Sequence, residues 1–166
     1  RLLERTVNLQ VFQVQYQSGD NWDVEIGRTY ERLDTPFTIS RGITLPLGGE
    51  YSNSRIQFRG QTANRRVLSA NGRFERAGFY SGTRNQAVLQ VNYRARPGLL
   101  FYANTEWNVV RLAEGAFQTR LFRLITENQF SPWVALVNNV QFDTVSRVMG
   151  WQSRFRWIMR PGNDLS

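Results

Sequence analysis

The side chains of this sequence that could bind or react with a ligand are mainly arginines and carboxylates. In several segments they occupy alternate positions. Between Trp151 and Arg160, the even positions read Gln, Arg, Arg, Ile and Arg, while the odd positions read Trp, Ser, Phe, Trp and Met. Side chains that alternate in this way point to opposite faces of a β-strand. One face of this segment is therefore aromatic and apolar, and the other is rich in arginine.

The same alternation elsewhere in the chain predicts one polar face that carries charges of both signs and would line the lumen of a barrel. Its charged members are Arg73, Glu75, Arg94, Arg96, Glu106, Arg123, Glu127, Asp143, Arg154, Arg156 and Arg160. Rings of arginine select anions in pores, so one hypothesis is a cationic lining that favours anionic solutes. The simpler interpretation is a structural ladder, in which these arginines pair with the carboxylates across strands.

The carboxylates also raise the question of an enzyme. Glu75, Glu106 and Glu127 could face one cavity, as the paired carboxylates of glycosidases do. Neighbouring arginines would lower the pKa of each carboxyl group, which suits ion pairs better than a general acid. The 166-residue chain has no His, Cys or Lys, which excludes the usual zinc sites, thiol catalysis, a Ser-His-Asp triad and disulfides. We therefore expect no enzymatic activity, no metal site and no cofactor.

The elements that must position these residues are strands, because β-branched and aromatic residues alternate with polar ones throughout. The fold class expected is all-β, an antiparallel up-and-down meander of about nine strands. A change of phase between Val11 and Phe12 predicts a β-bulge in the first strand. The strands are expected near residues 6–17, 22–32, 51–60, 66–79, 86–96, 99–111, 117–130, 133–144 and 149–160.

The connections suggest that the two ends of the sheet differ. Arg96-Pro97-Gly98 and Arg160-Pro161-Gly162 are identical tripeptides, and Ser131-Pro132 lies between them. Proline presets φ for a tight turn and cannot donate to a strand ladder, so these residues mark strand ends. The intervening connections, 112–116, 144–149 and the long 33–50, are predicted to be longer. Short turns at one end and longer loops at the other are typical of transmembrane barrels.

The two-faced strands allow two architectures. A strand on an ordinary core shows water its polar face, whereas a strand of a membrane barrel turns its apolar face to lipid and its polar face to the lumen. No apolar run approaches the roughly 18 residues of a transmembrane helix. In a membrane barrel, aromatic residues form girdles at the lipid interface, and in a soluble barrel or sandwich they fill the core. The girdle candidates are Trp22, Trp107, Trp133, Trp151 and Trp157.

One strand fits the membrane interpretation less well than the others. In the segment 117–130, Arg120 and Asn128 share a phase with Phe122 and Leu124. An arginine at the middle of a lipid face would cost about 2–4 kcal/mol, and this cost falls towards zero near the interface. Both polar residues lie near the ends of the predicted strand, where an interfacial place is tolerated.

The C-terminal third of the chain carries a pattern of short segments that resembles that of a known family. The segments are 114–121, 130–132, 139–143, 150–158 and 160–165, and the stretches 36–51 and 78–84 fit the same pattern. Together they resemble the C-terminal barrel region of the bacterial domain of unknown function 5916, which typically follows a family-9-like carbohydrate-binding module. The resemblance covers most of the chain from about residue 30 onward.

The resemblance implies an outer-membrane β-barrel of a Gram-negative bacterium without an established enzymatic activity. Residues 1–166 are then expected to be a single barrel segment of a longer chain, because the carbohydrate-binding module is absent and the family continues past Leu165. Single-chain bacterial barrels have even strand numbers, so a chain of nine strands is not expected to close alone. The partners implied are the outer-membrane bilayer and, through the missing module, carbohydrate.

The function expected is that of an outer-membrane protein that takes part in carbohydrate binding or solute passage. The alternative is a soluble β-barrel or sandwich that binds an anionic ligand, since the net charge is +8. Nucleic acid is a weaker candidate for the anionic partner. The basic residues are spread over almost every strand, whereas a binding surface for single strands collects them in one groove.

Overall fold

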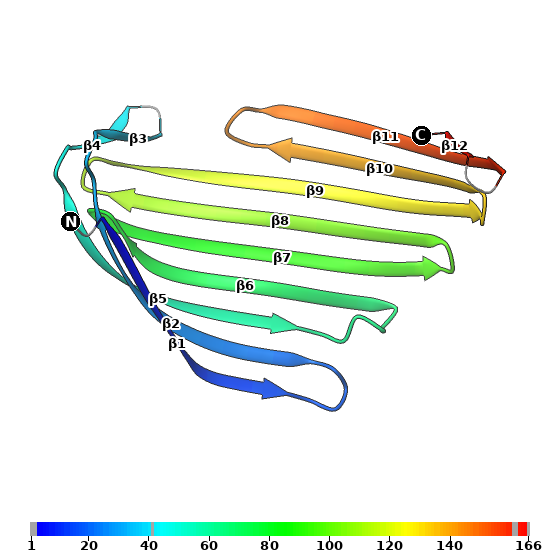
Figure 1. Ribbon diagram of the computed structural model, residues 1–166, viewed down its shortest axis with the longest axis horizontal. Coiled ribbons are helices and arrows are strands. Elements are labelled where there is room, and N and C mark those ends of the chain that lie inside the picture. Colours follow the sequence, from blue (N-terminus) through cyan, green and yellow to red (C-terminus); the bar gives the residue numbers. More distant parts are fainter. Residues whose placement is uncertain (1–2, 41, 161–162, 166) are drawn as a thin grey trace.

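The structure is a computed structural model that describes residues 3–40, 42–160 and 163–165, the last two residues of the long range and 163–165 by backbone alone. Nine long strands follow one another as antiparallel neighbours in one sheet, with a short tenth at its end (Figure 1). All nine predicted strands are present. They are β1 (Glu4–Gln15), β2 (Asn21–Arg32), β5 (Glu50–Gln61), β6 (Leu68–Phe79), β7 (Gly82–Arg96), β8 (Leu99–Leu112), β9 (Gly115–Ser131), β10 (Val134–Asp143) and β11 (Val148–Arg160), followed by β12 (Asn163–Leu165).

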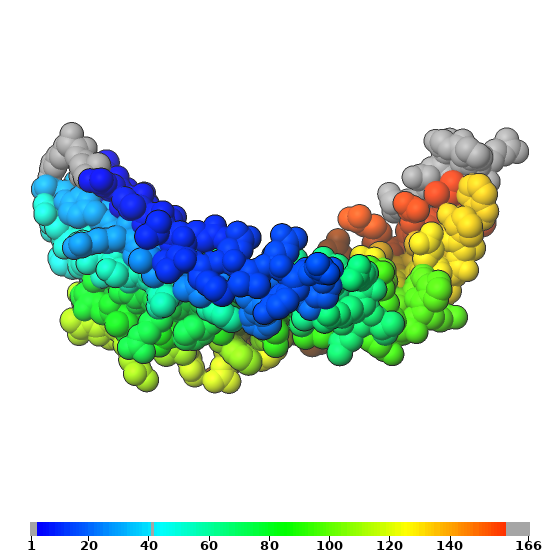
Figure 2. Space-filling view, turned by 90° about the horizontal axis from the view of Figure 1, so that it is seen from below, coloured from blue at the N-terminus to red at the C-terminus, as the bar shows by residue number. Residues whose placement is uncertain are grey.

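The sheet is curved and does not close on itself. Its strand order runs β1-β2-β5-β6-β7-β8-β9-β10-β11-β12, and β1 does not pair with β12 in the described part of the chain. The space-filling view shows an arched molecule that is hollowed on one side (Figure 2). The expectation that these strands do not close a barrel alone is confirmed.

The two faces of the sheet differ in composition as the alternation predicts. Along β5, the odd-numbered residues from Tyr51 to Gln57 are less exposed than the even-numbered residues between them. The register joins Gln57 to Glu75 on β6, Glu75 to Gln86 on β7, and Gln86 to Asn108 on β8. We call the surface that contains this row the polar face.

The opposite surface, which we call the apolar face, carries most of the large hydrophobic side chains of the strands. The row next to that of Gln57 runs through Phe58, Phe74, Ala87 and Trp107. Phe58, Phe74 and Trp107 are all exposed, and Trp151 reaches 72% exposure. Side chains crowd on the concave side of a curved sheet and spread apart on the convex side, so the polar face lies in the hollow.

The longest connection, residues 33–49, folds into a small hairpin that the sequence did not predict. Its strands are β3 (Phe37–Ser40) and β4 (Ile43–Leu45). Leu33, Ile43 and Leu45 of this connection are buried, and Leu45 has no exposed surface. A Cβ atom on Gly115 would lie 3.0 Å from Ile43, so the hairpin reaches the tip of β8 and β9.

The predicted difference in loop length between the two ends of the sheet is present only in part. The connections 33–49 and 144–147 are longer than the two-residue turns at Pro97 and Pro132, as predicted, but the third connection expected to be longer is not. The connection predicted at 112–116 consists only of Ala113 and Glu114, because β8 and β9 stay paired up to Leu112 and Gly115. The turn at Pro97 and Gly98 is equally short, and Gly98 has the positive φ of 78° that a Pro-Gly turn requires. At the same end of the sheet, however, the connection 62–67 is longer. Pro161 and Gly162 lie outside the described residues.

The predicted β-bulge in β1 is confirmed. The register of β1 on β2 shifts between Gln10 and Phe12, so Val11 has no partner on β2. Because of the bulge, Leu9 and Phe12 pair with Ile26 and Val24, and both lie on the apolar face.

Candidate functional site

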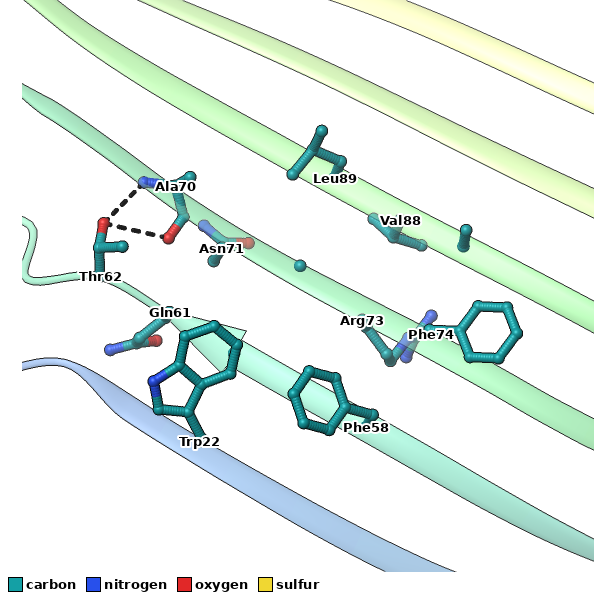
Figure 3. Close-up of a pocket in the computed structure, with 13 residues that line it drawn as sticks. Trp22, Phe58, Gln61, Thr62, Ala70, Asn71, Arg73, Phe74, Val88 and Leu89 are labelled. Carbon is teal, nitrogen blue, oxygen red and sulfur yellow. Dashed lines mark hydrogen bonds between the residues drawn. The ribbon is translucent and has the colours of Figure 1, made fainter. Parts of the chain in front are cut away.

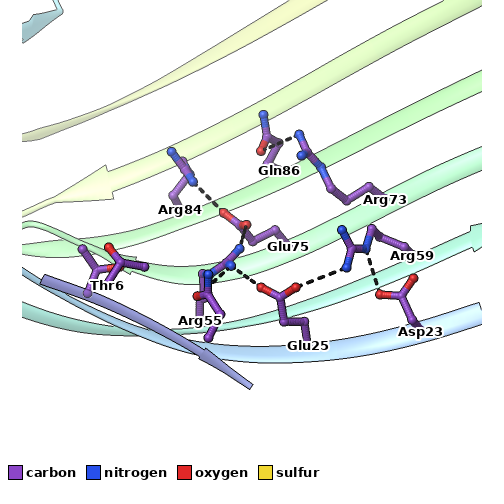
Figure 4. Close-up of polar contacts among 11 residues, drawn as sticks. Thr6, Asp23, Glu25, Arg55, Arg59, Arg73, Glu75, Arg84 and Gln86 are labelled. Atoms are coloured by element: carbon purple, nitrogen blue, oxygen red, sulfur yellow. Dashed lines mark hydrogen bonds and ion pairs between the residues drawn. The ribbon is translucent and has the colours of Figure 1, made fainter. Parts of the chain in front are cut away.

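A chain of alternating charges crosses the polar face over four neighbouring strands (Figure 4). The side chains come from β2, β5, β6 and β7, and consecutive members are joined by ion pairs. In order across the sheet, they are Asp23, Arg59, Glu25, Arg55, Glu75 and Arg84. The positive and negative members balance, so this part of the hollow is neutral.

Glu75 is the most buried of these six charged residues, with 5% of its surface exposed. One of its oxygens lies 3.1 Å from Nη1 of Arg55, and the other lies 2.5 Å from Nη2 of Arg84. Arg55 also pairs with Glu25, and the guanidinium of Arg84 lies 4.9 Å from the centre of the Phe79 ring. This arrangement suits a structural role, because protonation of the Glu75 carboxylate would leave Arg84 without an ion-pair partner among the described residues.

The structural ladder is therefore present, but its members differ from those expected. Within the part of the chain that the structure describes, Glu75 is the one predicted carboxylate that pairs with arginine. Glu106 accepts hydrogen bonds from Gln86 at 2.7 Å and Asn108 at 3.0 Å. Asp143 caps the following turn by accepting a bond from the backbone N–H of Val145 at 2.8 Å. The predicted polar face did not include Asp23, Glu25, Arg55, Arg59 and Arg84, although their alternation on β2, β5 and β7 is visible in the sequence.

The remaining arginines of the polar face form no ion pairs within the described residues. Arg73 donates to Gln86 at 3.3 Å, and Arg123 donates to Gln141 at 2.8 Å. The other arginines of this group with described side chains are Arg94, Arg154 and Arg156, which the register places on the same face as Glu127. The hollow thus carries a network of ion pairs over β2–β7, whereas the arginines and carboxylates described over β8–β11 lie on the same face without ion pairs between them.

Arg96 and Arg160, two predicted members of the polar face, differ from the others. The register of β7 on β8 shifts between Arg94 and Arg96, so Arg96 pairs with Leu99, which belongs to the apolar face. This irregularity next to the Pro97 turn takes Arg96 out of the alternation that the sequence suggested. Arg160 ends β11, but its side chain lies outside the described residues.

The apolar face has grooves that are lined almost wholly by carbon. One groove of about 380 Å³ lies between Trp22, Phe58, Phe74 and Leu89 (Figure 3). The Trp22 ring covers Gly60, where a Cβ atom would come within 2.6 Å of the ring, and the Phe58 ring lies 5.5 Å from it. A second groove of about 430 Å³ lies over β7 to β10. Both suit flexible hydrocarbon better than a polar ligand.

The five tryptophans of the sequence are all at least partly exposed. Trp22, Trp107, Trp151 and Trp157 lie on the apolar face, and Trp133 lies in the turn that leads into β10. Trp22, Trp133 and Trp157 are near the sheet end with the Pro97 turn, while Trp107 and Trp151 are nearer the other end. This distribution over two levels is what an interfacial girdle requires.

A small polar pocket of about 170 Å³ lies in the hollow where β2 and β6 end. The Tyr80 hydroxyl donates to Glu31 at 3.2 Å, and the Tyr80 ring contacts Tyr51 edge-on at 5.2 Å and Phe37 of the hairpin at 6.3 Å. Tyr80 occupies a two-residue turn with a φ of 48°, which non-glycine residues rarely adopt. Burial, reinforced by the negative charge of Glu31, raises the pKa of Tyr80 to about 12.

We expect the Tyr80 phenol to titrate near pH 12, later than an ordinary tyrosine with a pKa near 10. The folded state favours the neutral phenol, so the stability linked to this group is complete below pH 10 and is lost as the pH rises towards 12. The difference in tyrosinate absorbance between the wild-type protein and the Tyr80→Phe variant measures this step. A difference step centred at pH 10 would show that Tyr80 is not enclosed as the structure describes.

Asp20 links two connections at one end of the sheet, a contact that no sequence pattern predicts. Its carboxylate accepts bonds from Ser18 at 2.8 Å and from the backbone N–H of Ala63 at 2.8 Å, and it pairs with Arg66 at 2.7 Å. The hydrogen bonds from Ser18 and Ala63 lower the pKa of Asp20. This contact fixes the β1–β2 turn against the 62–67 connection.

No family model, no curated protein and no solved structure matches this chain. The family resemblance of the sequence is therefore a prediction that these comparisons do not test. Among the described residues, no three His, Cys, Asp or Glu side chains gather as a metal site. The described chain also contains no helix of the length and apolarity needed to cross a membrane.

Proposed function

We propose that this chain forms part of the wall of a transmembrane β-barrel in a bacterial outer membrane. In this proposal the apolar face contacts lipid and the polar face lines the lumen. The observation that carries it is the inverted exposure of the sheet, in which Glu75 and Gln57 are buried while Trp107 and Phe58 are exposed. A water-soluble sheet gains stability by the opposite arrangement.

The dimensions of the strands support the proposal. A tilted transmembrane strand needs about 9–11 residues to cross the hydrocarbon core. The shortest long strand, β10, has 10 residues, and the longest, β9, has 17. Every long strand can therefore cross, and the longer ones reach beyond the bilayer.

The lumen-facing surface would then serve the passage or binding of polar solutes. Ion pairs and amide groups cover the described part of this surface. Carbohydrate binding through a module outside this chain rests on the family resemblance alone. The alternative is a soluble β-barrel or sandwich for an anionic ligand. It is supported by Arg94, Arg154 and Arg156, which form no ion pairs within the described residues, but it needs a second layer to cover the apolar face.

Quenching of tryptophan fluorescence by brominated lipids tests the proposal. Bromine quenches an indole ring only in close contact, so we expect strong quenching in vesicles of brominated phosphatidylcholine and little quenching by acrylamide, which stays in water. Vesicles of the same lipid without bromine are the control. Protein that remains monomeric in plain buffer, with acrylamide as the stronger quencher, would exclude the membrane barrel and favour the soluble alternative.

A further inference from the structure

The charges on the apolar face are almost all positive. Among strand residues with described side chains, Glu50 is the one carboxylate on this face, and it pairs with Arg32 at 2.9 Å. The other strand carboxylates lie on the polar face. They are Glu4, Asp23, Glu25, Glu31, Glu75, Glu106, Glu127 and Asp143.

Besides Arg96, five arginines of the apolar face have no carboxylate partner within the described residues. They are Arg5, Arg28, Arg76, Arg111 and Arg120. All five are exposed, and the one hydrogen bond among their side chains runs from Arg28 to Ser52 at 3.1 Å. Each lies in the half of its strand nearer the β3–β4 hairpin, so the arginines gather at one end of the apolar face, while Arg96 lies at the other end.

Four of these arginines lie on one slanted line across the sheet. The row of Arg120 passes through Trp107 and Ala87 to Phe74, and Arg76 lies two residues beyond Phe74 towards the hairpin end.

The row of Arg76 passes through Ile56 to Ile26, and Arg28 lies two residues beyond Ile26 in the same direction. Arg28 pairs with Val7, and Arg5 lies two residues beyond Val7. Three shifts of two residues over the six steps from β9 to β1 amount to about one residue per strand.

A line with this slope is the one along which a membrane surface crosses a tilted barrel. One residue is about 3.3 Å along a strand and the next strand is about 4.8 Å away, which gives an angle of about 35°. Strands of closed barrels tilt by about 35–45° from the barrel axis. The four arginines would therefore lie at one level of the bilayer, on its lipid-facing side. Trp107, paired with Arg120, would lie at the same interface.

We infer that Arg5, Arg28, Arg76 and Arg120 form an arginine belt that binds the phosphate groups of anionic lipids at one membrane surface. A guanidinium group binds a phosphate by two parallel hydrogen bonds, and the lack of carboxylate partners leaves these groups available for it. Anionic lipids attract basic residues appreciably only within a short distance of the headgroups. The four arginines can therefore act together only if they lie at the same level of the bilayer. The inference rests on the proposed function.

Native mass spectrometry of the detergent-solubilised protein, with either phosphatidylglycerol or phosphatidylcholine added, tests the belt. We expect the wild-type protein to retain phosphatidylglycerol over phosphatidylcholine by about tenfold, since each basic residue near the surface adds to the attraction. The belt variant R5Q/R28Q/R76Q/R120Q should lose most of this preference. The matched control is R94Q/R123Q/R154Q/R156Q, which removes the same charge from the polar face and should keep the preference.

Each outcome has one meaning. Equal loss in both variants would show attraction by net charge alone, and no loss in the belt variant would show that lipid phosphates bind elsewhere, so either result would overturn the belt. A variant with lysine at the four belt positions keeps the charge but not the paired hydrogen bonds, so it should show an intermediate preference for phosphatidylglycerol. It tests the belt even if the glutamine variant does not fold. If the wild-type protein retains both lipids equally, the arginine belt is contradicted, but the proposal of a transmembrane barrel is not. Wild-type protein that needs no detergent contradicts the barrel itself.

Discussion

Glu75→Gln should lower the free energy of unfolding by about 3 kcal/mol, the largest effect that we expect from a single change on the polar face. The substitution keeps the shape of the side chain and removes its charge. Arg84 then loses its ion-pair partner among the described residues, while Arg55 keeps Glu25. Removing one partner of a buried ion pair costs about 3–5 kcal/mol. We expect an effect at the lower end of this range, because Arg55 still has Glu25 as an ion-pair partner. Urea unfolding in detergent micelles measures it.

Glu127→Gln is the matched control, because Glu127 lies on the same face without an ion pair among the described residues. We expect a change of at most about 0.5 kcal/mol for it. The double variant E75Q/R84Q should recover part of the lost stability, since it removes the charge that Glu75→Gln leaves unpaired. Equal effects of Glu75→Gln and Glu127→Gln would mean that the network on β5 to β7 contributes no more than scattered surface charges.

The strands and their two faces could be predicted because both follow from a period of two. Each side chain of a strand takes its face from its position alone, so the alternation of Val88 with Leu89 and Gln90 already assigns them. The bulge at Val11 was visible for the same reason, as a break in the period. Nothing beyond local sequence was needed for these features.

The pairing of charges could not be predicted, because it depends on register between strands. Glu25 and Glu75 meet on Arg55 only because β2, β5 and β6 align Gln57 between the two carboxylates. A shift of two residues would keep every face and change every partner. The pairing of Arg96 with Leu99 shows the same limit, since a local irregularity altered its phase.

The short turn between β8 and β9 and the β3–β4 hairpin could not be predicted for a different reason. Turn propensity marks where proline and glycine favour a reversal, but pairing can continue through residues of low propensity when the strands gain hydrogen bonds, as between Leu112 and Gly115. The β3–β4 hairpin has strands of three and four residues, too short for a periodic signal. Its order depends on burial of Ile43 and Leu45, which is a tertiary contact.

Leu89→Arg should reduce insertion into lipid vesicles more strongly than any other single change on the apolar face that we considered. Leu89 lies near the middle of β7, pairs with Gly72 and Thr105, and is 44% exposed. An arginine at the middle of a lipid face costs about 2–4 kcal/mol, a factor of roughly 30 to 1,000 in the folding equilibrium. The folded fraction in phosphatidylcholine vesicles, followed over a urea series, measures the effect.

Gln90→Arg is the control, one residue away and on the polar face between Asn71 and Asn104. We expect it to change stability by at most about 0.5 kcal/mol, because a lumen wall accepts another polar side chain. The comparison separates the two architectures. In a soluble sheet whose apolar face meets water, Leu89→Arg would be an ordinary surface substitution and would be tolerated as well as Gln90→Arg. In a soluble sandwich with a covered face, Leu89→Arg would be harmful in plain buffer without any lipid. Harm that appears only on transfer into vesicles fits the lipid-facing wall and neither alternative.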